Sequence, residues 1–161
     1  MTIFAIILAR GGSQGIPKKN IYPINGKPLI YYTIKQCREA GIENIYTSSD
    51  SEEILEIASN LGSKKLFRPK EFSTNFSTSE ESWIHAIQSI KEINFESDWI
   101  FAPQVTSPIR HPYDIKNACE MALTNKFDCL FSVVNFDYFF IWSFNKQKLS
   151  PMNYDYKQRK R

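Results

Sequence analysis

Apolar and polar residues alternate in blocks along the first part of the chain. Residues Ile3 to Leu8 form a continuous apolar run of strand length, which is typical of a strand buried on both faces of a parallel sheet. A loop rich in Gly, Pro, Lys and Asn follows, and from Pro28 to Gly41 the apolar positions recur at helical spacing. The pattern therefore predicts a strand, a loop and a helix, in that order.

The same order of elements repeats further along the chain. Strands are predicted over residues 44–48, 64–67, 99–102 and 129–134, and helices over 50–62, around 83–90 and over 112–123. Strands that alternate with helices of this length are joined by right-handed crossovers into a parallel sheet covered on both faces. The sequence therefore predicts a three-layer, Rossmann-like α/β fold, in which ligands bind at the carboxyl ends of the strands.

The end of the chain has a different character. Six aromatic residues lie between Phe136 and Phe144, and an Asn145-Lys-Gln-Lys148 turn follows them, which predicts a hairpin or an extended arm. This aromatic surface is interpreted either as an interface for a partner or as a lid over the domain's own core. We divide the chain into an α/β domain over residues 1–134 and an arm over residues 135–161.

Composition and charge restrict the class of protein. The 161 residues suffice for the core of one domain, and the net charge of +3 comes largely from a basic tail over residues 157–161. Such a short basic run is interpreted as a solvated end and gives little support to nucleic-acid binding. No leader peptide or membrane-spanning run is visible, so we expect a soluble protein that binds no membrane.

The three cysteines, Cys37, Cys119 and Cys129, show no metal-binding spacing. They are predicted to be buried thiols of a cytoplasmic protein.

The segment after the first predicted strand, residues 8–20, carries the clearest chemical signal. It combines three glycines with three basic side chains: Gly11, Gly12, Gly15, Arg10, Lys18 and Lys19. Glycines let the backbone bend tightly and bring its N–H groups close to an anion, and the basic side chains add positive charge. The spacing is neither that of a P-loop nor that of a dinucleotide fold. The loop predicts a polyphosphate site.

Several blocks give this loop a specific context. The stretch Arg10-Gly-Gly-Ser-Gln-Gly-Ile-Pro-Lys-Lys-Asn20, with Ile24-Asn-Gly-Lys-Pro-Leu29 after it, resembles the N-terminal signature of the acylneuraminate cytidylyltransferases, or CMP-sialic acid synthetases. Three later blocks agree in order and spacing: Thr47-Ser-Ser-Asp50, Arg68-Pro-Lys-Glu71 and Gln104-Val-Thr-Ser-Pro-Ile-Arg110. The resemblance covers essentially the whole chain and implies a nucleotide-diphospho-sugar transferase fold, with the CTP site in residues 1–134.

The resemblance also implies roles for particular residues. The catalytic positions that it assigns are Arg10, Lys19 and Gln104. The nucleotide-binding positions that it assigns are Gly11, Gly12, Ser13, Asn20, Arg68 and Ser79. Arg10 and Lys19 would hold the triphosphate of CTP, with Asn20 beside them. Arg68 and Ser79 would contact the cytosine, and Gln104 would lie near the ribose and the incoming sugar.

Structural alternatives stay open for some of these positions. Asp50 is expected either to belong to the site or only to cap the helix that follows it. Arg68 is alternatively a solvated loop residue, and Arg110 would face either substrate or solvent. His85 and His111 have no visible partner, and we expect no catalytic role for them.

The implied reaction transfers CMP from CTP to a nine-carbon sugar acid, either N-acetylneuraminate or a legionaminate or pseudaminate relative. The anomeric hydroxyl attacks the α-phosphorus and pyrophosphate leaves, with Mg²⁺ stabilising the charge. Enzymes for the eight-carbon acid Kdo are a more distant option.

The sequence departs from the family pattern. The late carboxylate pair that would hold Mg²⁺ is absent, so no metal ligand is predicted and the chain is expected to be C-terminally truncated. Gln14 replaces a frequent lysine, and Asn75 replaces a common aspartate. The activity of the chain is therefore open, and the alternative is an inactive CTP-binding remnant that acts as a partner of an intact homologue. Residues 135–161 are expected to form a partial arm for homodimerisation.

Overall fold

The computed structural model describes residues 2–91, 98–125, 127–133, 142–145 and 148–152. The chain divides into two compact units, Met1–Leu130 and Phe131–Arg161. Within the described residues, no helix is both long enough and apolar enough to span a membrane.

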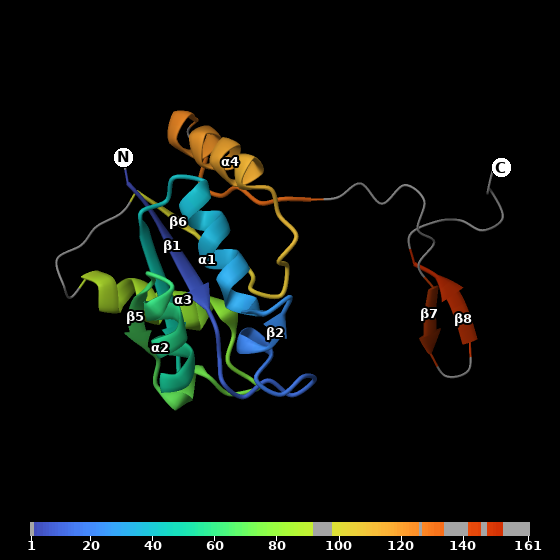
Figure 1. Cartoon of the computed structure of the whole chain (residues 1–161). Helices are drawn as coiled ribbons and strands as arrows, with labels where there is room; N and C mark the ends of the chain where they lie inside the picture. Colours follow the sequence, from blue (N-terminus) through green and yellow to red (C-terminus); the bar gives the residue numbers. More distant parts are fainter. Residues whose placement is uncertain (1, 92–97, 126, 134–141, 146–147, 153–161) are drawn as a thin grey trace. The chain divides into compact units, whose positions relative to one another are not determined.

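A parallel sheet lies at the centre of the first unit (Figure 1). Its strands are β1 (Ile3–Leu8), β4 (Asn44–Ser49), β5 (Lys64–Phe67) and β6 (Trp99–Phe101). Their order in the sheet is β5-β4-β1-β6, and all three neighbouring pairs are parallel. Because β1 lies between β4 and β6, the segments that leave these three strands meet at one edge of the sheet. This arrangement confirms the predicted Rossmann-like fold class.

Helices cover both faces of this sheet, as the pattern predicts. They are α1 (Leu29–Glu39), α2 (Glu52–Asn60), α3 (Ser79–Lys91) and α4 (Pro112–Thr124). Side chains of β1 alternate between the faces: Ala5 and Ile7 pack with α1, α2 and α4, whereas Phe4 and Ile6 pack with α3. Each face of β1 is therefore buried, which explains its continuous apolar run.

Short elements and turns connect these layers. Lys19–Ile21 and Lys70–Phe72 form the 3₁₀ helices η1 and η2, and β2 (Pro23–Ile24) pairs with β3 (Lys27–Pro28) in a small hairpin. Asn25 and Gly26 at its tip both have positive φ, as a two-residue hairpin turn requires.

The second unit contains a hairpin. Its strands β7 (Trp142–Asn145) and β8 (Lys148–Pro151) are antiparallel, with Phe144 opposite Leu149. The predicted hairpin is confirmed for these residues. The aromatic residues at 136–140 and the basic tail at 157–161 lie outside the described residues.

Two predictions are wrong in the described residues. No strand forms over residues 129–133; instead Phe131 is 77% exposed and Val133 is 81% exposed. An apolar run becomes a strand only where a neighbouring strand accepts its hydrogen bonds, and periodicity does not show whether one is present. Cys129 is exposed rather than buried, whereas Cys37 is buried and Cys119 is intermediate.

Candidate active site

A cleft of about 380 Å³ opens beyond the carboxyl end of β1. It is lined by the loop after β1, the segment from β5 into α3, and the loop after β6. The predicted site residues among its lining are Arg10, Ser13, Lys19, Asn20, Arg68, Ser79 and Gln104. Gly11 and Gly12 belong to the same loop but do not line the cleft. The fold thus brings together seven side chains that are spread along the sequence from Arg10 to Gln104.

Bonds to α2 and within the loop hold the glycine-rich segment of residues 9–20. The Gly11 amide donates to the Asp50 carboxylate at 2.8 Å, and the Asn20 amide donates to the Arg10 carbonyl at 2.9 Å. Lys18 forms an ion pair with Glu53 at 2.7 Å. Asn20, which is buried, therefore closes the loop on itself, and Lys18 points to α2 while Lys19 lines the cleft.

The three glycines of this loop differ in their surroundings. None of its three glycines has positive φ; the left-handed residue is Lys18, at φ 52°. A Cβ at Gly11 would lie 3.0 Å from the Cβ of Ser51, whereas a Cβ at Gly12 or Gly15 would meet no atom within 4 Å. Gly11 therefore avoids a tight contact with Ser51 at the start of α2, and Gly12 and Gly15 leave the backbone accessible.

Asp50 does not cap α2. The N-cap residue is Ser51, without a side-chain capping bond, and the Asp50 carboxylate accepts from Gly11 instead. Asp50 is therefore a positioning residue for the loop, and the capping alternative is wrong.

Arg10 is oriented by two uncharged acceptors. Its Nη1 donates to the Thr74 carbonyl at 2.8 Å and to Asn75 Oδ1 at 3.1 Å. These bonds tie the glycine-rich loop to the loop before α3 without neutralising the guanidinium.

Arg68 is 3% exposed, so the interpretation as a solvated loop residue is wrong. Its Nε donates to Ser73 Oγ at 2.9 Å. Burial lowers the pKa of the Arg68 guanidinium from its ordinary value, the Asp50 carboxylate opposes that shift, and the charge of Arg10 adds to it. Arginine nevertheless keeps its proton, so Arg10 and Arg68 place two positive charges close enough to interact at one cleft.

Six further hydroxyl and amide side chains line one side of the cleft, and they were not assigned to the site from the sequence. They are Ser73, Thr74, Asn75, Ser77, Thr78 and Ser82. The signal was present as a dense run of Ser, Thr and Asn. A capping box also marks its end, because Thr78 Oγ1 accepts from the Glu81 amide and the Glu81 carboxylate accepts from the Thr78 amide.

Three further residues lie outside the cleft. Arg110 does not line the cleft; it is half-buried and bonds to Thr33, Gln36 and the carbonyl of Gln104. The His85 ring packs 5.0 Å from that of Phe72, and His111 is the N-cap of α4. Neither histidine lines the cleft.

The described residues do not fit a metal ion by themselves. They contain no group of three or more His, Cys, Asp or Glu side chains that would hold one. The Asp50 carboxylate beside the glycine-rich loop accepts a backbone amide.

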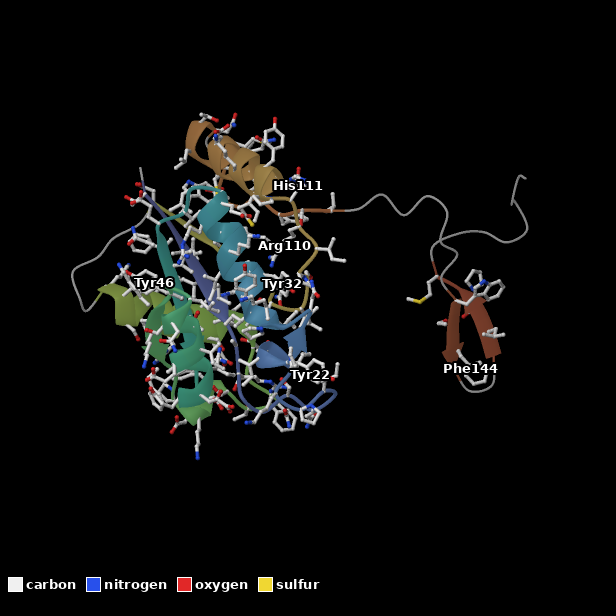
Figure 2. All side chains as sticks on the ribbon, in the orientation of Figure 1. Tyr22, Tyr32, Tyr46, Arg110, His111 and Phe144 are labelled. Carbon is white, nitrogen blue, oxygen red and sulfur yellow. The ribbon has the colours of Figure 1, made fainter. Side chains whose placement is uncertain are left out.

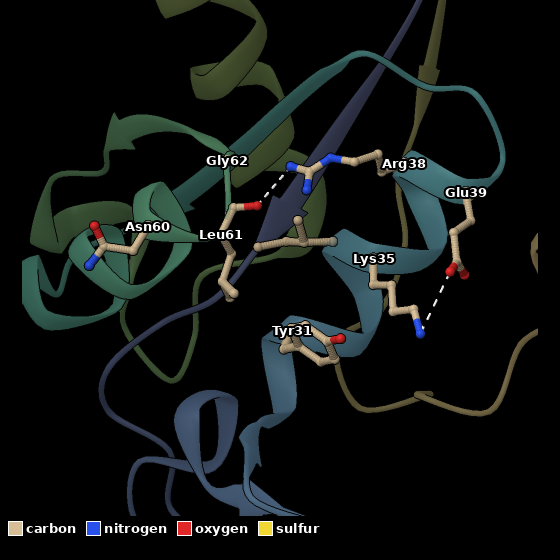
Figure 3. A pocket seen from close by; sticks show the side chains of 8 residues that line it. Tyr31, Lys35, Arg38, Glu39, Asn60, Leu61 and Gly62 are labelled. Carbon is tan, nitrogen blue, oxygen red and sulfur yellow. Dashed lines mark hydrogen bonds and ion pairs between the residues drawn. The ribbon is translucent and has the colours of Figure 1, made fainter.

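A second cavity, of about 470 Å³, lies between α1 and the end of α2 (Figure 3). Arg38 Nη2 donates to the Leu61 carbonyl at 2.7 Å, and Lys35 pairs with Glu39 at 3.6 Å. None of the predicted site residues lines this cavity. Of these two cavities, the first is therefore the one lined by predicted site residues.

Comparisons with known proteins identify the family of the chain. Residues 4–151 match a family model described as Cytidylyltransferase. The chain is 37% identical over 140 residues to a pseudaminic acid cytidylyltransferase of Campylobacter jejuni subsp. jejuni serotype O:23/36 (strain 81-176), covering 86% of this chain and 60% of that protein. It is 37% identical over 138 residues to an N-acylneuraminate cytidylyltransferase of Oncorhynchus mykiss, covering 85% of this chain and 31% of that protein.

Solved structures share the fold at low sequence identity. A CMP:2-keto-3-deoxy-manno-octonic acid synthetase complexed with CTP superimposes with a TM-score of 0.63 at 19% identity, covering 77% of this chain and 48% of that one. A cytidylyltransferase from Leptospira borgpetersenii serovar Hardjo-bovis (strain JB197) gives a TM-score of 0.60 at 19% identity, covering 78% and 50%. The chain thus spans about half of these structures and less than two thirds of both relatives above.

Proposed function

The chain belongs to the cytidylyltransferase family, and from that premise we propose that its cleft binds CTP and transfers the CMP group to a nine-carbon sugar acid of the sialic type. The observation that carries this proposal is the convergence of Arg10, Lys19, Arg68, Ser79 and Gln104 on one cleft. Relatives named as enzymes support a transferase over the alternative of a nucleotide-binding remnant.

In the proposed reaction the anomeric hydroxyl oxygen of the sugar bonds to the α-phosphorus of CTP. The bond from that phosphorus to pyrophosphate breaks, and the hydroxyl proton is released. Because little covalent chemistry falls to the protein, its task is to position the groups and to stabilise negative charge. The un-neutralised guanidinium of Arg10 and the ammonium of Lys19 suit the triphosphate.

The other lining residues suit the base and the sugar. Arg68 offers donors only, which match the O2 and N3 acceptors of cytosine, whereas N3 of uracil carries a proton. We assign the cytosine contact to Arg68 and Ser79, and the ribose and sugar contact to Gln104. For the sugar acid, the two relatives support acylneuraminate and pseudaminate equally.

Mg²⁺ remains an expectation of the family chemistry. The described residues offer no cluster of His, Cys, Asp or Glu side chains to hold it, so the roles proposed here are assigned to side chains of the cleft alone. The cytoplasm is the proposed location, since the three cysteines are unpaired thiols, as is usual in a reducing compartment.

The hairpin of the second unit supports a homodimer. Strand alternation places Phe144 and Leu149 on one face, and they are 70% and 61% exposed. A two-stranded hairpin is at best marginally stable alone in water, so we propose that this face packs against a second copy of the chain. Sedimentation analysis of F144S/L149S tests this: a monomer is expected where the wild type is a dimer, and a monomeric wild type would refute it.

Calorimetric titration with CTP, and with UTP and ATP as controls, tests the proposed nucleotide. We expect binding selective for CTP, loss of affinity in R10A and K19A, and loss of discrimination against UTP in R68A. Lys35→Ala is the matched control, because Lys35 is a partly exposed lysine that lies outside the cleft. Equal affinity for ATP and CTP would overturn the proposal.

Turnover is tested by pyrophosphate release with N-acetylneuraminate and with pseudaminate. Release with one acid and not the other identifies the sugar. Selective CTP binding without release for any nine-carbon acid would favour the remnant over the enzyme.

A further inference from the structure

The loop of residues 102–111, between β6 and α4, carries Gln104 to the cleft without regular secondary structure. Val105, beside Gln104, is buried in the core and anchors one side of the loop. Pro108 and Arg110 lie on its other side. Loops of this kind hold a side chain in place only when their backbone polar groups find partners.

Those partners come from α1. Gln36 Nε2 donates to the Pro108 carbonyl at 2.6 Å and to the Arg110 carbonyl at 3.1 Å. In return, Arg110 Nε donates to Gln36 Oε1 at 3.2 Å. Arg110 lies beside α1 in Figure 2. Gln36 thus satisfies two loop carbonyls and one guanidinium N–H through a single side chain.

The same guanidinium reaches the cleft residue itself. Arg110 Nη2 donates to Thr33 Oγ1 at 2.9 Å and to the carbonyl of Gln104 at 3.1 Å. Thr33 is fully buried and Gln36 is 9% exposed, so the helix side of the network is shielded from water. Burial lowers the pKa of Arg110. Breaking such a network would leave buried polar groups unsatisfied, and this cost keeps the network rigid.

We infer that Thr33, Gln36 and Arg110 form a clamp that fixes the backbone of Gln104 and thereby positions its side chain for the bound nucleotide. These three are positioning residues, because they reach the ligand only through Gln104. The inference rests on the proposed function for the identity of the ligand, but the clamp itself does not depend on it.

A double-mutant cycle measured by calorimetric CTP titration tests the clamp. We expect R110K and Q104A each to weaken CTP binding by about fivefold, the worth of one hydrogen bond. If Arg110 acts through Gln104, R110K/Q104A binds no more weakly than Q104A alone. If the double variant instead loses the product of the two single-variant losses in affinity, Arg110 has a general structural role and the inference is overturned.

A matched control is available on the same helix. Arg38 of α1 also donates to a backbone carbonyl, that of Leu61, but away from the cleft. R38K is expected to leave the affinity for CTP unchanged. Should R110K fold poorly, T33V removes one acceptor of the clamp with almost no change of shape and is expected to act in the same direction.

Hydrogen exchange of the nucleotide-free protein separates the clamp from the proposed function. R110K and T33V are expected to accelerate exchange over residues 102–111 while leaving residues 9–20 unchanged. Acceleration throughout the unit, or none at all, would overturn the clamp. A wild-type chain that binds no CTP overturns the proposed function instead, and the exchange pattern then decides the clamp alone.

Discussion

The carboxylate of Asp50, at the end of β4, accepts the backbone N–H of Gly11 at 2.8 Å. The bond links the segments that leave two neighbouring parallel strands, β1 and β4. It fixes where the glycine-rich loop turns towards the cleft, while the negative charge of the carboxylate interacts with Arg68. Asp50 therefore has two separable effects, one geometric and one electrostatic.

Substitution of Asp50 separates those effects. D50A leaves the Gly11 amide without its acceptor, so we expect a loss of about 1 kcal/mol of stability and weaker CTP binding. D50N keeps an acceptor but removes the negative charge that offsets Arg68, so its CTP affinity is expected to equal or exceed that of the wild type. Urea unfolding and calorimetry check both. D50N binding as weakly as D50A would mean that the carboxylate acts on the ligand directly.

Gly11 and Gly12 form a matched pair. A Cβ at Gly11 would crowd Ser51, whereas Gly12 faces open space. We expect G11A to lose about 1–3 kcal/mol of unfolding free energy through overpacking, and G12A to stay close to the wild type in stability. Thermal unfolding of the two variants decides this, and equal losses would contradict the close approach of α2.

Asn75 sets the charge around Arg10. In N75D the new carboxylate would form an ion pair with Arg10, which it now contacts through an amide oxygen. We expect N75D to weaken CTP binding several-fold at low salt. The new carboxylate would compete with the triphosphate for Arg10, and its negative charge would repel the triphosphate. The loss should shrink as salt is raised, since salt screens exposed charges. N75Q serves as the neutral control, and tighter binding by N75D would refute this account.

Gly41 and Gly62 follow α1 and α2 with φ of 87° and 86°. Alanine at either position is strained in this region, at a cost of about 1 kcal/mol. At Gly62 the new Cβ would also collide with the Arg38 guanidinium, which holds the Leu61 carbonyl, whereas Gly41 has space around it. We expect G62A to lose more stability than G41A in urea unfolding. In an R38A background the two losses should become equal.

Burial raises the pKa of the Cys37 thiol from 9.0 to about 12. Above pH 9 the unfolded chain loses this proton while the folded chain keeps it, so stability falls as pH rises from 9 towards 12. The slope contributed by Cys37 approaches about 1.4 kcal/mol per pH unit. Urea unfolding of the wild type against C37A checks this, because other titrating groups are common to both. Parallel pH profiles would contradict it.

The sequence by itself determined the fold class and predicted seven of the residues that line the cleft. Continuous apolar runs and period-3.6 patterns depend on which side chains face a core, so they located β1, β4, β5, β6 and the four helices. The motif around Arg10 and the blocks at Arg68 and Gln104 selected residues that line one cleft. These motifs could be recognised in the sequence because each follows a predicted strand, and ligands of a parallel sheet bind at the carboxyl ends of its strands. Their roles in CTP binding remain predictions.

Only the tertiary structure decided what holds these residues in place. The bonds from Asp50 to Gly11 and from Arg110 to Thr33 join positions 39 and 77 residues apart, and they depend on strand order and helix packing. The failed strand over residues 129–133 has the same cause, because pairing needs a neighbour that no local pattern shows. Local periodicity records burial, whereas hydrogen-bond partners across the chain exist only after the layers have packed.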